Sequence, residues 1–167
     1  MTAPGSSVHA SAVLVGNRAV LIRGPSGSGK SRLAFDVILA GRARQIASAM
    51  LVGDDRVLLE VVQSELMVRP ARGLEGLIEI RGLGIRRCEF AEQAPVGLVV
   101  DLSAHDADRM PPPESLVCEI YGIKIPRIPV GSAFPPLPLV LAALSTRPSD
   151  DCRKEFGNHI SPTIATQ

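Results

Sequence analysis

Residues 24–31 read GPSGSGKS and match the pattern G-x-x-x-x-G-K-[ST]. The glycines of such a loop let backbone N–H groups turn inward around phosphate oxygens. The lysine adds a positive charge beside the phosphates, and the final hydroxyl can bind Mg²⁺. A chance match in a chain of this length has a frequency on the order of 1%. We therefore predict a binding site for the phosphates of a nucleotide such as ATP, formed by Gly24, Pro25, Ser26, Gly27, Ser28, Gly29, Lys30 and Ser31.

The segments around this loop supply the strand and the helix that it requires. Residues 8–23 contain two β-rich apolar runs separated by Gly16-Asn17, a pattern that predicts a tight hairpin. Residues 31–41 place apolar side chains at helical spacing, which predicts an amphipathic helix, and Gly41 is a plausible stop. A strand before the loop and a helix after it are the context in which this motif binds phosphate.

The rest of the chain favours strands over helices. A nearly continuous apolar run at 96–102 predicts a strand that is covered on both faces. Frequent hairpins and one strong helix favour an α/β fold with a mixed sheet over a strictly alternating parallel one. We expect one domain over residues 1–145 and a polar tail over 146–167. The other predicted segments are strands at 56–62, 65–69 and 77–80, a glycine-rich turn at 82–85, a hairpin at 116–128, irregular proline-rich chain at 126–138 and a short helix at 139–144.

Composition excludes several classes of protein. The 167 residues are 46% hydrophobic and 21% charged, with a net charge of +1, as in one globular domain. This length is too short for a (β/α)₈ barrel or a two-lobed protein kinase. Aromatic residues make up only 3%, which argues against nucleic-acid binding by base stacking. No apolar run spans a bilayer, no secretory signal is expected, and the three cysteines are widely spaced, so we expect a cytoplasmic protein without a membrane partner.

Carboxylates are the candidate metal ligands and bases. Asp54-Asp55 follows an apolar strand downstream of the predicted helix, where a nucleotide-using enzyme needs a carboxylate near the metal. Because adjacent carboxylates repel, one of them can act as a base, although a solvated turn is an equal alternative. Glu79 alternates with isoleucines and His9 lies in an alternating strand, and these patterns alone favour structural roles.

Four segments together resemble the kinase domain of HPr kinase/phosphorylase, a family of bacterial protein-serine kinases. They are VHAS at 8–11, GPSGSGKS at 24–31, VGDDRV at 52–57 and IEIRGLGI at 78–85. The resemblance implies a P-loop fold related to phosphoenolpyruvate carboxykinase, and hexamers. It also implies ATP-dependent phosphorylation of a serine on HPr, the small phosphocarrier of the sugar phosphotransferase system, and removal of that phosphate by inorganic phosphate.

The resemblance also implies roles for individual residues. His9 assists catalysis, Lys30 contacts the phosphates, and Asp55 is the base that accepts the serine proton. Mg²⁺ is held by Ser31 and Glu79, and Asp54 is the further metal candidate from the acidic pair. The arginine of the late Asp-Arg pair of the family matches Arg109, which we include among the catalytic candidates.

The chain departs from the family pattern at three places, one of which is a longer segment from Gly41 to Gly53 between the helix and the acidic pair. Full-length members carry an additional N-terminal domain, whereas the phosphate loop begins here at residue 24, so we expect the kinase domain alone. The late motif Pro-x-x-Pro-Gly-Arg-Asn, tied to the phosphorylase reaction and to subunit contacts, has no counterpart, since residues 128–135 read IPVGSAFP. This absence argues against the phosphorylase reaction.

The sequence therefore predicts a Mg²⁺/ATP-dependent protein-serine kinase with a regulatory role, acting on HPr or an HPr-like phosphocarrier. One alternative is a P-loop kinase of small molecules, although no arginine-rich lid is evident. Another is an ATP-binding regulatory module without transferase activity, which would tolerate the loss of His9, Asp55 and Glu79.

Overall fold

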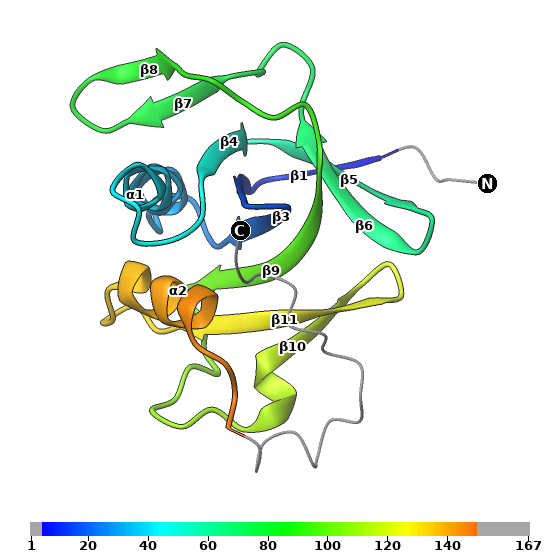
Figure 1. The fold of residues 1–167 in the computed structure, drawn as a ribbon, viewed down its shortest axis with the longest axis vertical. Coiled ribbons are helices and arrows are strands. Elements are labelled where there is room, and N and C mark those ends of the chain that lie inside the picture. The colour runs from blue at the N-terminus through cyan, green and yellow to red at the C-terminus, as the bar shows by residue number, and fades with distance from the viewer. Residues whose placement is uncertain (1–4, 150–167) are drawn as a thin grey trace.

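Strands dominate the chain in the computed structural model, which describes residues 5–149. Its elements, in chain order, are β1 (Ser6–Val8), β2 (Ser11–Val15), β3 (Arg18–Arg23), α1 (Lys30–Arg42), β4 (Ala49–Gly53), β5 (Val57–Val62), β6 (Glu65–Pro70), β7 (Leu77–Ile80), β8 (Gly84–Arg87), β9 (Ala94–Leu102), the 3₁₀ helix η1 (Pro113–Leu116), β10 (Val117–Ile120), β11 (Ile123–Val130) and α2 (Pro136–Ser145). One nine-stranded sheet follows the order β1-β5-β6-β9-β3-β2-β4, with β11 beside β9 and β10 beside β11. The strands β7 and β8 form a separate hairpin next to α1 (Figure 1).

Strand β9 lies between parallel and antiparallel neighbours. It pairs in parallel with β3 and β11 and antiparallel with β6, while β2–β3, β5–β6 and β10–β11 are antiparallel pairs. This arrangement confirms the predicted α/β fold with a mixed sheet. The carboxyl ends of the parallel strands β3, β9 and β11 lie at one end of the sheet, where ligands bind in folds of this kind. The segments 24–29, 103–112 and 131–135 therefore begin at the same end of the sheet.

The core has two parts, one on each face of the sheet. Along β3, Val20 and Ile22 join the cluster that packs against α1 and α2, whereas Leu21 joins the cluster on the opposite face. This alternation follows from the two-residue period of a strand. Both helices cover the same face (Figure 1). Cys118 is half-buried at the margin of the second cluster.

The prediction of irregular chain over 126–138 is wrong at its beginning. Strand β11 continues through Pro126 and Pro129 to Val130. The pairing with β10 ends at Pro126, so one side of β11 is a sheet edge beyond that residue. Proline is tolerated at a sheet edge because its missing N–H leaves no ladder hydrogen bond unmade there.

The predicted helix runs one residue further than its expected stop. Gly41 lies inside α1, which ends at Arg42. A Cβ atom at Gly41 would lie 2.6 Å from the Cβ of Ala49, at the start of β4. This glycine therefore permits close packing of the helix on the strand rather than ending the helix.

Other boundaries shift by a few residues. The run predicted as one strand at 8–15 is divided between β1 and β2, because the chain bends at His9. The segment 82–85 is a turn that already includes the first residues of β8. The helix predicted at 139–144 is confirmed and extends to both sides, as α2.

No helix within residues 5–149 is long and apolar enough to cross a bilayer. The predicted tail is described only as far as Ser149, and Cys152 and His159 lie outside the described residues.

Candidate active site

The phosphate loop connects β3 to α1. Gly24, Gly27 and Gly29 have φ angles of 153°, 78° and 96°, which side-chain-bearing residues rarely adopt. Gly29 is the N-cap of α1 and supplies no side-chain hydrogen bond. The first N–H groups of the helix are therefore available to an anion, and the helix dipole favours negative charge at this end.

Lys30 is buried, Ser28 is partly buried, and the surroundings of both side chains suit a phosphate. The Lys30 Nζ donates hydrogen bonds to the carbonyl oxygens of Gly24 (2.9 Å) and Pro25 (3.0 Å). Within residues 5–149 no carboxylate forms an ion pair with this lysine. The Ser28 Oγ is buried and finds no hydrogen-bond partner within the same residues. A buried hydroxyl without a partner is costly, and a phosphate oxygen would satisfy it.

Asp54 connects β2, α1 and β7 through hydrogen bonds. It is buried, and its Oδ1 accepts hydrogen bonds from the Ser11 hydroxyl (2.5 Å) and the Ser31 hydroxyl (2.8 Å). Its Oδ2 accepts the backbone N–H of Glu79 at 3.0 Å. Ser31 and Asp54, both expected near Mg²⁺, are therefore in direct contact.

Ser11 is a member of this cluster that the sequence interpretation missed. It is fully buried, at 0% exposure, in a strand whose other residues are all apolar. A polar side chain at an inward position of such a strand needs a partner, and this was the available signal. The partner, Asp54, is distant in sequence and could not be read from the pattern.

Asp55 points to solvent, unlike its neighbour. Its backbone φ is 63°, in the left-handed region, and 69% of its side chain is exposed. Its Oδ1 lies 3.3 Å from the Nε2 of His9. The pairing of β1 with β5 places Val8 opposite Val57, and it brings His9, just after β1, close to Asp55, two residues before β5. An exposed carboxylate beside an imidazole is available to a large acceptor molecule.

Glu79 and Arg109 are less closely joined to this cluster. Glu79 lies on β7 and contacts Asp54 through its backbone, while its side chain is exposed. Arg109 lies exposed in segment 103–112, which begins at the carboxyl ends of the parallel strands, as the phosphate loop does. No hydrogen bond or ion pair links its side chain to the acidic pair among the described residues.

Residues 5–149 contain no group of three or more His, Cys, Asp or Glu side chains that could hold a metal by themselves. Mg²⁺ characteristically uses one or two protein carboxylates together with substrate phosphates and water. The contact between Ser31 and Asp54, to which the backbone of Glu79 on β7 is hydrogen-bonded, fits that donor set.

Comparison with known proteins assigns this chain to a family. The family model described as HPr Serine kinase C-terminal domain matches residues 1–133. The chain belongs to this family. An HPr kinase/phosphorylase of Mycoplasma mycoides subsp. mycoides SC is 34% identical over 106 residues, which are 59% of this chain. That match spans 32% of the relative's length, about a third.

A solved structure supports the same assignment. The HPr(Ser) kinase/phosphatase from Coxiella burnetii is similar with a TM-score of 0.65 and 26% sequence identity. The similarity covers 83% of this chain and 92% of that one. The fold of the HPr kinase domain, predicted from four short motifs, is therefore confirmed.

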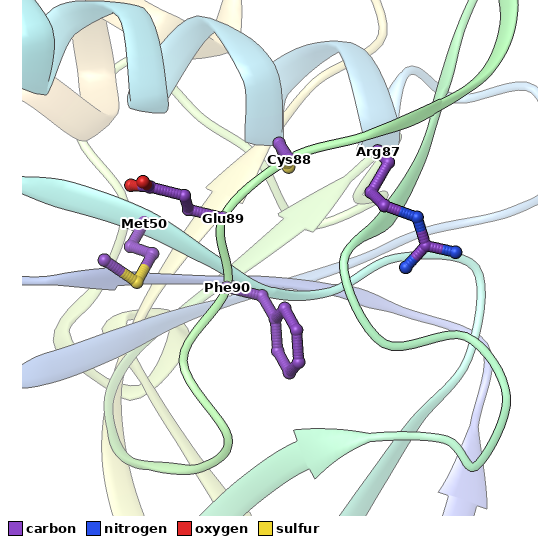
Figure 2. Close-up of a pocket in the computed structure, with 5 residues that line it drawn as sticks. All are labelled: Met50, Arg87, Cys88, Glu89 and Phe90. Atoms are coloured by element: carbon purple, nitrogen blue, oxygen red, sulfur yellow. The ribbon is translucent and has the colours of Figure 1, made fainter.

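One surface hollow of this HPr kinase domain has no residue of the phosphate loop in its lining. It has a volume of about 820 Å³ and is lined by Met50, Arg87, Cys88, Glu89 and Phe90. Figure 2 shows that Met50 and Glu89 extend to one side of the 88–90 segment, whereas Arg87 and Phe90 extend to the other. Burial raises the pKa of the Cys88 thiol, which disfavours the reactive thiolate. The side chains do not converge on a ligand, so this hollow is not the candidate site.

Proposed function

We propose that this domain is a Mg²⁺/ATP-dependent protein kinase that phosphorylates a serine of HPr or of an HPr-like phosphocarrier. One observation carries the proposal. A phosphate loop with an unneutralised lysine adjoins an acidic pair whose first carboxylate is buried against Ser31 and whose second is exposed beside His9. The relatives' names supply the acceptor.

The chain's own residues account for the steps of such a transfer. The loop glycines, Lys30 and Ser28 would bind the ATP phosphates, and Lys30 would offset charge on the transferred group. Ser31, Asp54 and Glu79 would hold Mg²⁺, which supplies charge neutralisation at the phosphates when bound. Asp55 would accept the proton of the acceptor serine, and His9 would orient that carboxylate. Arg109 would approach the phosphates from segment 103–112, which follows β9.

The division between Asp54 and Asp55 also accounts for a protein acceptor. The buried carboxylate is surrounded by hydroxyl and amide donors, whereas the exposed one can be reached by a folded partner. We further propose a cytoplasmic regulatory role in a phosphotransferase system, a homo-oligomer that the resemblance makes a hexamer, and action in the kinase direction. The missing late motif at 128–135 argues against the phosphorylase direction.

Mass spectrometry of an HPr-like protein tests the proposal. After incubation with this chain, ATP and Mg²⁺, we expect one added phosphate on a serine, and none when that serine is replaced by alanine. Absence of phosphoserine over a range of ATP and metal concentrations would contradict it. ATP turnover with a metabolite alone would support a small-molecule kinase, and ATP binding without turnover would support a regulatory module.

A further inference from the structure

Four charged residues form a chain of ion pairs beside the phosphate loop. Arg23, the last residue before Gly24, donates from its Nε and Nη2 to both carboxylate oxygens of Asp101, at 2.7 and 2.8 Å. The Nε of Arg127 donates to the same carboxylate at 2.5 Å. The other edge of Arg127 donates to both oxygens of Asp106, at 2.7 and 3.0 Å. Two guanidinium groups and two carboxylates therefore alternate, with no net charge.

These ion pairs lower the pKa of both of their carboxylates. Burial opposes the charge on Asp101, but the hydrogen bonds and charges of Arg23 and Arg127 outweigh it and lower the pKa of Asp101. The hydrogen bond from Arg127 lowers the pKa of Asp106. Only 13% of the Arg127 side chain and 17% of the Asp101 side chain are exposed. Paired guanidinium–carboxylate contacts of this kind fix orientation as well as charge.

The chain of ion pairs ends in the segment that carries Arg109. Asp101 lies opposite Arg23 in the parallel β3–β9 pair, so that end is fixed by the sheet. Asp106 lies in segment 103–112, which has no helix or strand of its own. Near Asp106, the segment is otherwise tied by the Ala104 N–H to the Val130 carbonyl at 2.9 Å. Arg127 also donates to the carbonyl of Ser115, beyond the other end of the segment.

We propose that Arg127 is a positioning residue for phosphoryl transfer. Its two hydrogen bonds to Asp106, the fork, hold segment 103–112 and therefore Arg109. Asp101 and Arg23 connect Arg127 to the phosphate loop, so the position of Arg109 is fixed relative to that loop. The proposal rests on the proposed kinase function and on Arg109 acting at the transferred phosphate. A lysine at position 127 would keep the charge but lose the fork, so charge alone would not restore the position.

The experiment compares D106N with the wild type. Asp106 is half-exposed, so D106N removes the fork partner from the surface end of the chain and leaves the buried pairs intact. We expect kcat for transfer to an HPr-like protein to fall between about 10- and 100-fold, the range that misplacement of a reacting group produces. The Kd for ATP should stay within about twofold, because the phosphate loop is unchanged. The conservative variant D106E should recover part of kcat, and R127K should resemble D106N.

Limited trypsin digestion gives a second measurement that needs no acceptor. The bond after Arg109 lies in segment 103–112, so release of the segment should raise its cleavage rate in D106N by about tenfold or more. The matched control is E65Q, which breaks the exposed ion pair between Arg18 on β3 and Glu65 on β6. Its N–O distance is 2.7 Å, the same as in the Arg127–Asp106 pair. E65Q should leave both cleavage after Arg109 and kcat unchanged.

Three results would overturn the proposal. The first is D106N with wild-type cleavage after Arg109, whether or not the wild type is a kinase. The second is D106N with faster cleavage but unchanged kcat. The third is an equal loss of activity in E65Q, which would indicate general destabilisation. A wild type that phosphorylates no acceptor would instead contradict the proposed function, and the digestion would still show whether Arg127 holds the segment.

Discussion

Two acidic centres lie on either side of the phosphate loop, and their carboxylates are treated in opposite ways. Around Asp54 the donors are neutral hydroxyl and amide groups, and no arginine or lysine neutralises the charge among the described residues. Around Asp101 two guanidinium groups neutralise the carboxylate completely. The first centre keeps negative charge available for a cation, whereas the second uses it up internally.

The same contrast holds for the cations. Among residues 5–149, Lys30 hydrogen-bonds only to backbone carbonyls, whereas Arg127 contacts two carboxylates and one carbonyl. A group that retains unneutralised charge in a buried place gains the most from a ligand of opposite charge. The residues around Lys30 and Asp54 therefore suit ligand binding, whereas the ion pairs of Asp101 and Arg127 stabilise the fold. The two regions meet in the sequence at Arg23 and Gly24.

The largest effect is expected from removal of the unneutralised cation. K30M should lower phosphoryl transfer by about 10³-fold, because among the described residues no other lysine or arginine side chain hydrogen-bonds to the loop. Transfer is followed by mass spectrometry of the acceptor. R32M, which removes an exposed cation from the same helix, is the control and should keep its activity. Equal losses in both variants would contradict the assignment to Lys30.

Replacement of the exposed carboxylate comes next. D55N should lower transfer by about 10²- to 10³-fold, the contribution of a general base, and leave ATP affinity nearly unchanged. Asparagine suits the test because it tolerates the left-handed backbone at this position, where φ is 63°. Kinetics and nucleotide titration separate the two quantities. Full activity in D55N would show that another group accepts the proton.

Gly24 lies between the two regions, and its substitution is expected to change stability. A Cβ at Gly24 would lie 2.6 Å from the Ser28 Oγ and 3.1 Å from the Leu102 carbonyl oxygen. G24A should therefore lower the free energy of unfolding by about 1–3 kcal/mol. In G27A nothing lies within 4 Å of the new atom and only the backbone φ is strained. Denaturation of both variants should show the greater loss in G24A, and the reverse order would contradict the packing around Gly24.

The smallest effect is a dependence of stability on pH at the neutralised centre. Because the pKa of Asp101 is lowered in the folded state from 3.8, its stabilisation is complete above that value and is lost as the pH falls through the folded pKa. R127Q should be less stable than the wild type at pH 5–7, and the difference in Tm should narrow below about pH 4. Thermal unfolding across this range measures it. A difference that grows toward acid pH would have the wrong sign.

Local patterns were sufficient for most of the fold. The glycine-rich loop, the hairpin at Gly16-Asn17 and the helix after Lys30 depend on neighbouring residues, and the structure confirms them. Strand β11 was misjudged because its prolines are tolerated only at a sheet edge, and sheet order is a long-range property. Gly41 was misjudged for the same reason, since its role depends on Ala49 across the helix–strand contact.

The site shows the same limit. The loop and the acidic pair could be identified from motifs, and the contact of His9 with Asp55 agrees with the roles assigned by resemblance, although these roles remain predictions. The partner of Ser11 and the ion pairs of Arg127 could not be identified, because the residues that meet are between 21 and 43 positions apart in sequence. Single charged residues in strands and loops look solvent-exposed until the strand pairing is known.

Under the proposed function, the three-residue strand β1 makes the acceptor step depend on the amino-terminal segment. Within the described part of the chain it is an edge strand that pairs with β5 alone, and it brings His9 to Asp55 without contributing to the phosphate loop. A protease cut or a bulky fusion that displaces Ser6–Val8 would separate the histidine from the carboxylate and leave the nucleotide site whole. Nucleotide affinity and transfer rate could therefore be uncoupled from outside the core, without changing a residue of either centre.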